Sequence, residues 1–157
     1  MTTVLLEKLK KEGLTVLDPL RDPRMNVKNI EVRNGEEEDL HFIPAWSTRH
    51  AGYVAGLGTF GIHRHIITRK GCCGSLTTII SAEELEADDR DYTGPYDYFS
   101  RCGQCAEKCP AGAITLENLR NLKKCSAHGG YLRETVGGGG CSKCMMGVPC
   151  ELGIPGR

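Results

Sequence analysis

The sequence is poor in aromatic residues, in net charge and in long apolar runs. Phenylalanine, tryptophan and tyrosine make up only 6% of the 157 residues, so we expect a thin apolar core for a chain of this length. The 20 basic and 20 acidic side chains cancel, which leaves no overall field to attract nucleic acid or an acidic membrane. No apolar run approaches the roughly 18 residues of a membrane-spanning helix. These absences argue against a membrane or a nucleic acid as partner.

The first residues also lack a targeting signal, because no basic segment leads into a clean apolar stretch. The expected location is therefore the cytoplasm. The chain nevertheless contains nine cysteines. In a reducing compartment this count predicts metal or redox chemistry rather than disulfides, and an odd number weakens a disulfide framework further. Something other than apolar burial is thus expected to hold part of the fold together.

The first 81 residues carry signals for two helices and several short strands. Capping residues and glycines delimit the helices, which are expected between Thr3 and Gly13 and from Ser47 to Gly58. The turn signal Asn34-Gly35 predicts a hairpin. The expected strands span residues 14–17, 27–33, 39–43, 65–68 and 76–81, and the last two are joined through the turn at 70–74.

A change in composition divides the chain near residue 90. Residues 83–95 are acidic and end in Gly94-Pro95, which is typical of a linker. The chain beyond is rich in cysteine and glycine and is expected to contain only short helices. We therefore expect a small α+β region over residues 1–90 and a separate module over residues 91–157.

Seven cysteines beyond residue 100 follow the spacing of an iron–sulfur protein. Cys102, Cys105 and Cys109, the last followed by Pro110, reproduce the final three-quarters of the bacterial ferredoxin run C-x2-C-x2-C-x3-C-P. In two-cluster ferredoxins the cysteine before proline ligates the other cluster. This rule assigns Cys102, Cys105 and Cys150 to cluster 1. It assigns to cluster 2 the remaining four: Cys109, Cys125, Cys141 and Cys144.

Zinc is the competing interpretation, because two C-x2-C pairs also suit a tetrahedral site of four thiolates. The protein would then be a zinc-stabilised interaction module. The seven cysteines, the Cys-Pro pair and the small residues at 111–113 favour two clusters of the 4Fe-4S type. The predicted fold is thus α+β, in which a small antiparallel sheet with helices is followed by a ferredoxin-like two-cluster iron–sulfur module.

The first position of the ferredoxin run is occupied by Phe99, which leaves cluster 1 one protein thiolate short. Cluster 1 is then either a 3Fe-4S cluster or a cluster completed by another ligand. The candidates are Cys72, Cys73, a histidine, water and a substrate. Cys72 and Cys73 are adjacent, so their side chains diverge, and a turn with two small residues is the simpler interpretation.

Two further patterns carry less weight. Residues 56–61 match G-x-G-x-x-G, but a dinucleotide site needs a strand before this motif and a helix after it, and the expected order here is reversed. These glycines are expected to end a helix and to allow close backbone packing. His63 and His65 lie in a small basic patch over residues 63–70. A solvated surface is favoured over an anion site there, and no third metal ligand is evident nearby.

Three stretches, residues 47–61, 102–114 and 141–151, together resemble the C-terminal half of the epoxyqueuosine reductase-like iron–sulfur proteins, which are related to reductive dehalogenases. The resemblance covers about residues 41–157. It implies a two-cluster ferredoxin module with the cluster partition given above, beside a nitroreductase-like, corrinoid-binding domain of which residues 1–90 would be a remnant. Family members usually have a long N-terminal portion that supplies most of the corrinoid pocket. The short segment before the resemblance here argues against cobalamin binding and tRNA reduction.

The predicted function is one-electron transfer through two iron–sulfur clusters, to or from a redox protein partner or a second subunit. The first alternative is a corrinoid-dependent reductase of the epoxyqueuosine reductase type, or a subunit of one. The zinc-stabilised module is the second. No catalytic residue of such a reductase can be assigned on this sequence.

Overall fold

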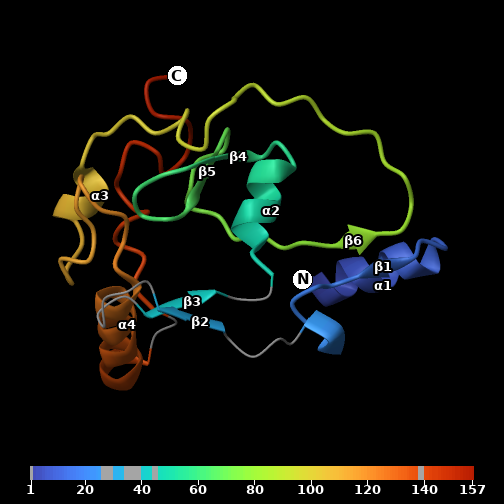
Figure 1. Cartoon of the computed structure of the whole chain (residues 1–157), viewed down its shortest axis with the longest axis horizontal. Coiled ribbons are helices and arrows are strands. Elements are labelled where there is room, and N and C mark those ends of the chain that lie inside the picture. Colours follow the sequence, from blue (N-terminus) through green and yellow to red (C-terminus); the bar gives the residue numbers. More distant parts are fainter. Residues whose placement is uncertain (1, 26–29, 34–39, 44–45, 138–139) are drawn as a thin grey trace.

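The computed structural model describes residues 2–25, 30–33, 40–43, 46–137 and 140–157. The helices in this part of the chain are α1 (Thr2–Lys11), α2 (Thr48–Val54), α3 (Gln104–Glu107) and α4 (Leu122–Val136), with a 3-10 helix over Pro23–Met25. The strands are β1 (Val16–Leu17), β2 (Ile30–Arg33), β3 (Leu40–Ile43), β4 (Gly58–Phe60), β5 (Ile66–Thr68) and β6 (Ile80–Ser81). They form three two-stranded antiparallel sheets, β1–β6, β2–β3 and β4–β5 (Figure 1). The α+β class is confirmed, with three small sheets in place of one.

Local turn and capping chemistry explains the elements that the sequence predicts well. Helix α1 is followed by Gly13, whose φ of 87° lies in the left-handed region that favours glycine. Strands β2 and β3 form the predicted hairpin, with Ile30 opposite Ile43. The acidic residues at 34–39 lie outside the described part of the chain. The Ser47 hydroxyl accepts a hydrogen bond from the backbone N–H of His50 and caps α2.

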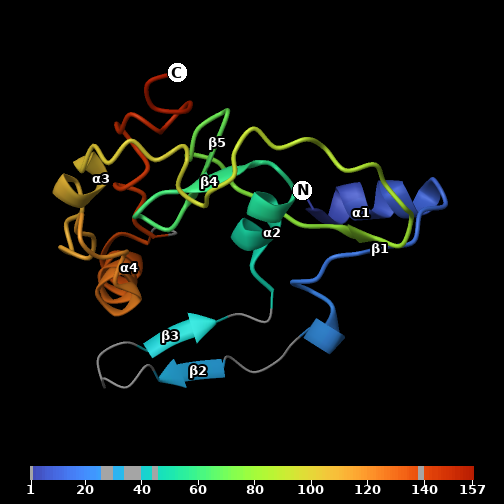
Figure 2. The same cartoon turned by 45° about the horizontal axis from the view of Figure 1, so that its top comes forward.

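The strand predicted at 65–68 is present as β5, whereas of the strand predicted at 76–81 only the last two residues form a strand, β6, and the two strands do not pair with each other. Strand β5 pairs with β4, and β6 pairs with β1 (Figure 2). A methyl group at Gly58 would lie 2.0 Å from the carbonyl oxygen of Ile67, so only glycine allows β4 to approach β5 this closely. The predicted close backbone packing in the G-x-G-x-x-G segment is thus observed, and Gly58 itself begins a strand.

The expectation of only short helices beyond residue 90 is wrong, because α4 has 15 residues. Its ends are well defined. The Asn121 side chain accepts a hydrogen bond from the N–H of Lys124 at 2.9 Å, and Gly137 ends the helix with a φ of 68°. None of its residues is buried, so no apolar stripe reveals this helix in the sequence.

The end of the acidic segment packs onto α2 and β4. Tyr92 and Tyr98 are buried, and the Tyr92 ring stacks on Tyr53. The N–H of Tyr98 donates to the Thr59 hydroxyl at 2.9 Å, and the N–H of Phe60 donates to the Pro95 carbonyl at 2.6 Å. These contacts place the start of the ferredoxin-like run directly after a fixed segment.

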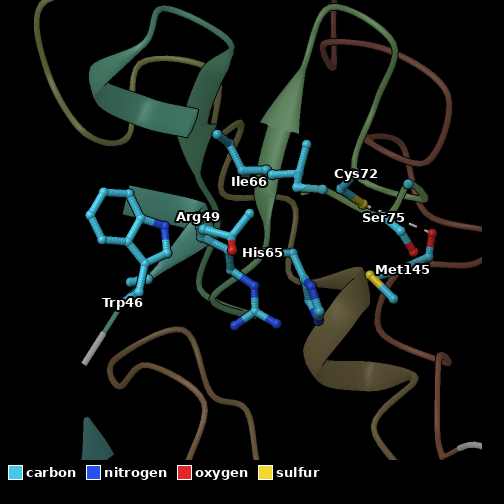
Figure 3. A pocket seen from close by; sticks show the side chains of 11 residues that line it. Trp46, Arg49, His65, Ile66, Cys72, Ser75 and Met145 are labelled. Carbon is cyan, nitrogen blue, oxygen red and sulfur yellow. Dashed lines mark hydrogen bonds between the residues drawn. The ribbon is translucent and has the colours of Figure 1, made fainter. Parts of the chain in front are cut away.

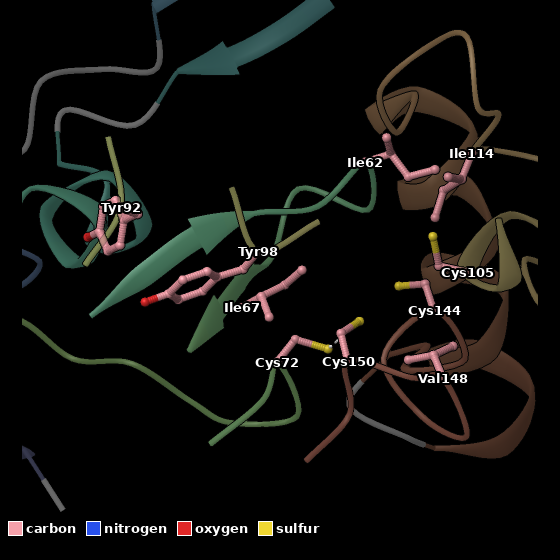
Figure 4. Close-up of a cluster of buried hydrophobic side chains, with 10 residues drawn as sticks. All are labelled: Ile62, Ile67, Cys72, Tyr92, Tyr98, Cys105, Ile114, Cys144, Val148 and Cys150. Atoms are coloured by element: carbon pink, nitrogen blue, oxygen red, sulfur yellow. Dashed lines mark hydrogen bonds between the residues drawn. The ribbon is translucent and has the colours of Figure 1, made fainter. Parts of the chain in front are cut away.

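Ten buried residues form the main core, which we call the thiol core because four of them are cysteines (Figure 4). They come from both sides of residue 90, and the predicted domain boundary there stays a prediction. The members are Ile62, Ile67, Cys72, Tyr92, Tyr98, Cys105, Ile114, Cys144, Val148 and Cys150. Among the described residues, no helix has the length and apolar character to cross a bilayer.

Candidate metal centre

The nine cysteines are all free thiols within the described residues, and they differ in exposure. The seven that the spacing singles out span the range from buried to exposed. Cys72, Cys105, Cys144 and Cys150 are buried, Cys109, Cys125 and Cys141 are half-buried, and Cys73 and Cys102 are exposed. A single buried thiol in an apolar core is common, but packing alone does not explain four of them in one core.

The ferredoxin-like run is shaped by a glycine and a single helical turn. Gly103 adopts a φ of 76° and begins α3, which turns Cys105 into the thiol core. Cys109 follows the helix. The N–H of Ala113 donates to the Cys109 sulfur at 3.3 Å. The small residues after Cys-Pro thus bring backbone N–H groups to a predicted cluster ligand, and such hydrogen bonds stabilise a thiolate.

The buried thiols carry strongly shifted pKa values. Burial raises the pKa of Cys105 to about 11, and the neighbouring Cys102, Cys150 and Cys144 add to this effect. Burial also raises the pKa of Cys144, and Cys125 and Cys141 raise it further, whereas Arg120 lowers it. Cys105 thus lies near cysteines of both predicted clusters, so these neighbours do not separate the two ligand sets. The assignment to two clusters stays a prediction.

The spacing of the cysteine sulfurs does not fit a four-thiolate zinc site. With a Zn–S distance of about 2.3 Å, four tetrahedral thiolates lie about 3.8 Å apart. The part of the chain that the structure describes includes all nine cysteines. It holds one group of three His, Cys, Asp or Glu ligand atoms within 4.8 Å of one another, namely His63, Cys72 and Cys150. The other cysteines form no such compact group there.

The turn at residues 71–73 lies against residues 150–151. The N–H of Cys72 donates to the carbonyl of Cys150 at 2.8 Å, and the N–H of Cys73 donates to that of Glu151 at 3.2 Å. Gly71 has a φ of 86°, and a methyl group on it would lie 2.0 Å from the Glu151 carbonyl oxygen. The Cys72 sulfur therefore lies 3.6 Å from that of Cys150, whereas the Cys73 side chain is exposed.

His63 joins this pair from the loop after β4. Its side chain is only 1% exposed, and its Nε2 atom lies 3.6 Å from the Cys150 sulfur. This corrects the expectation of a solvated patch for His63, although Arg69 and Lys70 are exposed as expected, and it corrects the view that no further metal ligand lies near His63. The sequence gives no sign of the contact, because Cys150 lies 87 residues further along the chain.

The pKa values of the two neighbouring thiols, Cys72 and Cys150, are shifted in opposite directions. The hydrogen bond with Cys150 raises the pKa of Cys72, and burial adds to it. Donation from Cys72 and then from His63 lowers the pKa of Cys150 to about 5, against the opposing effect of burial. Cys150 is therefore the better thiolate of the pair, and a thiolate is the form that binds metal.

A cavity of about 430 Å³ is lined in part by Cys72 (Figure 3). Arg49 and His65 line it, and the His65 Nε2 atom accepts a hydrogen bond from Arg120 at 3.0 Å. Burial, followed by the nearby charges of Arg49 and Arg120, lowers the pKa of His65 to about 3. His65 is thus neutral at pH 7, and the positive charge beside the cavity comes from Arg49 and Arg120.

Comparison with protein-family models, with curated proteins and with solved structures gives no match for this chain. The resemblance to the epoxyqueuosine reductase-like proteins therefore stays a prediction from three stretches of sequence. The site must be interpreted from its own geometry and chemistry.

Proposed function

We propose that this protein is an iron–sulfur electron carrier with two cubane-type clusters. Cluster 1 would be held by Cys102, Cys105 and Cys150. Cluster 2 would be held by Cys109, Cys125, Cys141 and Cys144. The single observation that carries the proposal is that Cys105 of the C-x2-C-x3-C-P run shares one buried core with Cys144 and Cys150, while Cys109 of the same run packs against that core.

The composition of that core supports bound clusters over a purely apolar role for the thiols. Cysteine buries less apolar surface than leucine or phenylalanine, and phenylalanine is absent from the ten buried residues. A chain of this length needs more stabilisation than so small a core supplies. Metal binding that occurs only in the folded state adds its free energy to folding and makes up this difference.

The spacing of the thiols favours clusters over zinc. In a cubane each thiolate binds a different iron, so the sulfurs stand farther apart than around a single ion. The lack of a compact group of three or more among the seven assigned cysteines, all of which lie in described segments, agrees with this requirement.

The chain's own residues would set the redox properties of the clusters. Bound clusters would supply one-electron transfer between a reduced and an oxidised partner protein. The Ala113 N–H on Cys109 and the Arg120 charge near Cys144 both stabilise negative charge, which increases when a cluster is reduced. The exposed Cys102 brings cluster 1 close to the surface, where a partner protein can approach it.

Metal and sulfide analysis tests this proposal. Protein purified without oxygen should contain about eight iron and eight acid-labile sulfide atoms per chain, and full reduction should give EPR signals from two clusters. Zinc should be absent. A colourless protein with stoichiometric zinc and no sulfide would overturn the proposal in favour of a zinc-stabilised module.

A reductase is the second candidate, and the cavity beside Cys72 is the observation that favours it. Its volume is within the range of small-molecule sites, and it lies next to the thiol core. A corrinoid-dependent reductase of the epoxyqueuosine reductase type would use this face together with walls from a second subunit. Cobalt analysis and a corrinoid absorption spectrum after anaerobic incubation with cobalamin distinguish this candidate from a simple carrier.

A further inference from the structure

We infer that Cys72 supplies the fourth thiolate of cluster 1, and that His63 donates an N–H···S hydrogen bond to Cys150 in the same ligand set. The inference rests on the proposed function. That function leaves cluster 1 with three cysteines, because Phe99 occupies the first position of the ferredoxin-like run. The full set would be Cys72, Cys102, Cys105 and Cys150.

Phe99 does not leave an open place for a ligand at its own position. Its side chain packs against the thiol core. Its backbone N–H donates to the carbonyl of Tyr96 at 2.9 Å, which holds the segment in a turn. The side chain thus closes the side of the core from which the missing thiolate would otherwise come. The fourth ligand must approach from another segment.

The turn at 71–73 provides that segment. Cys72 is 3% exposed and belongs to the thiol core together with Cys105 and Cys150. Its sulfur lies 3.6 Å from the Cys150 sulfur, a hydrogen-bond distance, so the two side chains must rotate apart for their sulfurs to bind different irons of one cubane. Its position does not depend on the thiol contact alone. Two backbone hydrogen bonds and the close approach of Gly71 to Glu151 hold the turn in place. The backbone of the turn is thus preorganised, and only the thiol side chains have to rotate when a cluster binds.

A mononuclear ion on His63, Cys72 and Cys150 is the competing interpretation, and the hydrogen bonds of His63 argue against it. The backbone N–H of His65 donates to Nδ1 of His63 at 3.0 Å, so Nδ1 carries no proton. The neutral ring then carries its proton on Nε2, which faces Cys150. A protonated Nε2 has no lone pair for a metal. His63 is therefore a donor to sulfur, and a mononuclear ion would keep only two protein ligands.

The hydrogen bond gives His63 a definite role. Reduction places additional negative charge on the iron and its sulfur ligands, and an N–H directed at a ligating sulfur stabilises that charge. Gly61 leaves room for the His63 ring, because a methyl group there would lie 2.7 Å from the ring carbon Cε1. The N–H of His63 should thus raise the reduction potential of cluster 1 and leave that of cluster 2 nearly unchanged.

The adjacent cysteines offer a matched test of the ligand. Cys72→Ala and Cys73→Ala are prepared anaerobically in the full chain, and iron content and EPR spectra are measured before and after brief exposure to air. Cys72→Ala should lose about one iron per chain and show a 3Fe-type signal when oxidised, whereas Cys73→Ala should match the wild type. The cluster 2 signal, retained in both, shows that the variants fold.

The outcomes separate this inference from the proposed function. A wild type without iron and sulfide would overturn the proposed function. A wild type with two clusters that already shows the 3Fe-type signal, and is unchanged by Cys72→Ala, would overturn the inference alone. One equivalent of Co²⁺ bound by the apoprotein, and lost in His63→Phe, would establish the mononuclear site and also overturn the inference.

The role of His63 is tested by redox titration. His63→Phe should lower the potential of one cluster only, and His63→Gln, which keeps an N–H donor, should restore part of it. His50→Phe is the control, since this exposed histidine lies against Phe60 and neither ring belongs to the thiol core. Equal potentials in the wild type and His63→Phe would refute the hydrogen bond to a cluster ligand.

Discussion

The two ends of the molecule are held together by different means. At one end, α1, β1 and β6 contain no cysteine and are joined by backbone hydrogen bonds, such as that from the Ala82 N–H to the Thr15 carbonyl at 2.9 Å. At the other end, the thiol core contains four cysteines among ten buried residues. Figure 1 places α1 and α4 at opposite sides of the chain. The first end is joined by ordinary hydrogen bonding, whereas under the proposed function the second would also depend on the clusters that its thiols bind.

Removal of the clusters should give the largest effect. If the proposed clusters are present, chelation or oxidation should cause the amides of residues 98–150 to exchange rapidly with deuterium, because the core there would lose its bound metal. Ile62, Ile67 and Cys72 share this core, so residues 59–74 should lose protection with it. The amides of β1 and β6 should change least. Equal loss of protection at both ends would show that the comparison between them is wrong.

Two cysteines four residues apart should affect different clusters. Cys105→Ser should damage cluster 1 and Cys109→Ser cluster 2, each with loss of up to about half of the iron, because the cysteine before proline ligates the other cluster. EPR spectra of the two fully reduced variants are the measurement. Loss of the same signal from both would refute the crossed assignment.

The contact between the 71–73 turn and residues 150–151 should depend on one glycine. Gly71→Ala places a side chain at a φ of 86° and a methyl group 2.0 Å from the Glu151 carbonyl oxygen. The unfavourable backbone alone costs about 1–3 kcal/mol of folding free energy, and the clash adds to it. Denaturant unfolding of the reconstituted protein measures the loss.

Gly74→Ala is the matched control for this variant, since a methyl group at Gly74 meets no atom within 4 Å. It should unfold at nearly the wild-type denaturant concentration. If the two alanine variants were equally stable, the close contact at Gly71 would not contribute to the fold.

The smallest expected effect is a pH dependence at Asp97. Its carboxylate accepts hydrogen bonds from the N–H groups of Gly94 and Thr93, both at 2.9 Å, and these lower its pKa. A lowered pKa in the folded state means that the stabilisation is present above the ordinary pKa of about 4 and is lost as the pH falls through the lower folded value. Asp97→Asn should therefore show a flatter stability profile between about pH 5 and pH 2, followed by circular dichroism. A profile parallel to that of the wild type would contradict this.

The features that sequence reasoning predicted are those with local causes. The Ser47 cap and the Asn34-Gly35 hairpin signal act within a few residues, so the helix and the strands they delimit could be predicted. Strand β4 and helix α4 could not. The first depends on the close approach of Gly58 to Ile67, and the second has capped ends but no buried face.

The same distinction between local and distant causes applies to the candidate site. The Cys102–Cys109 run is visible because its spacing is local, and its assignment to clusters stays a prediction. The position of Cys72 beside Cys150 is not visible, because 78 residues separate them and nothing in either neighbourhood indicates the other. Only the backbone contact between the 71–73 turn and residues 150–151 brings them together.

The contact between Cys72 and Cys150 also has a consequence for chain entropy. With Cys72 as a ligand, cluster 1 closes a loop of 78 residues that encloses every ligand of cluster 2. By analogy with a disulfide, a cross-link over such a loop restricts the unfolded chain and stabilises the fold by about 4 kcal/mol. If cluster 2 forms first, it shortens the free chain within that loop and makes the final closure less costly. The nested ligand sets therefore favour an order of assembly in which the inner cluster precedes the outer one.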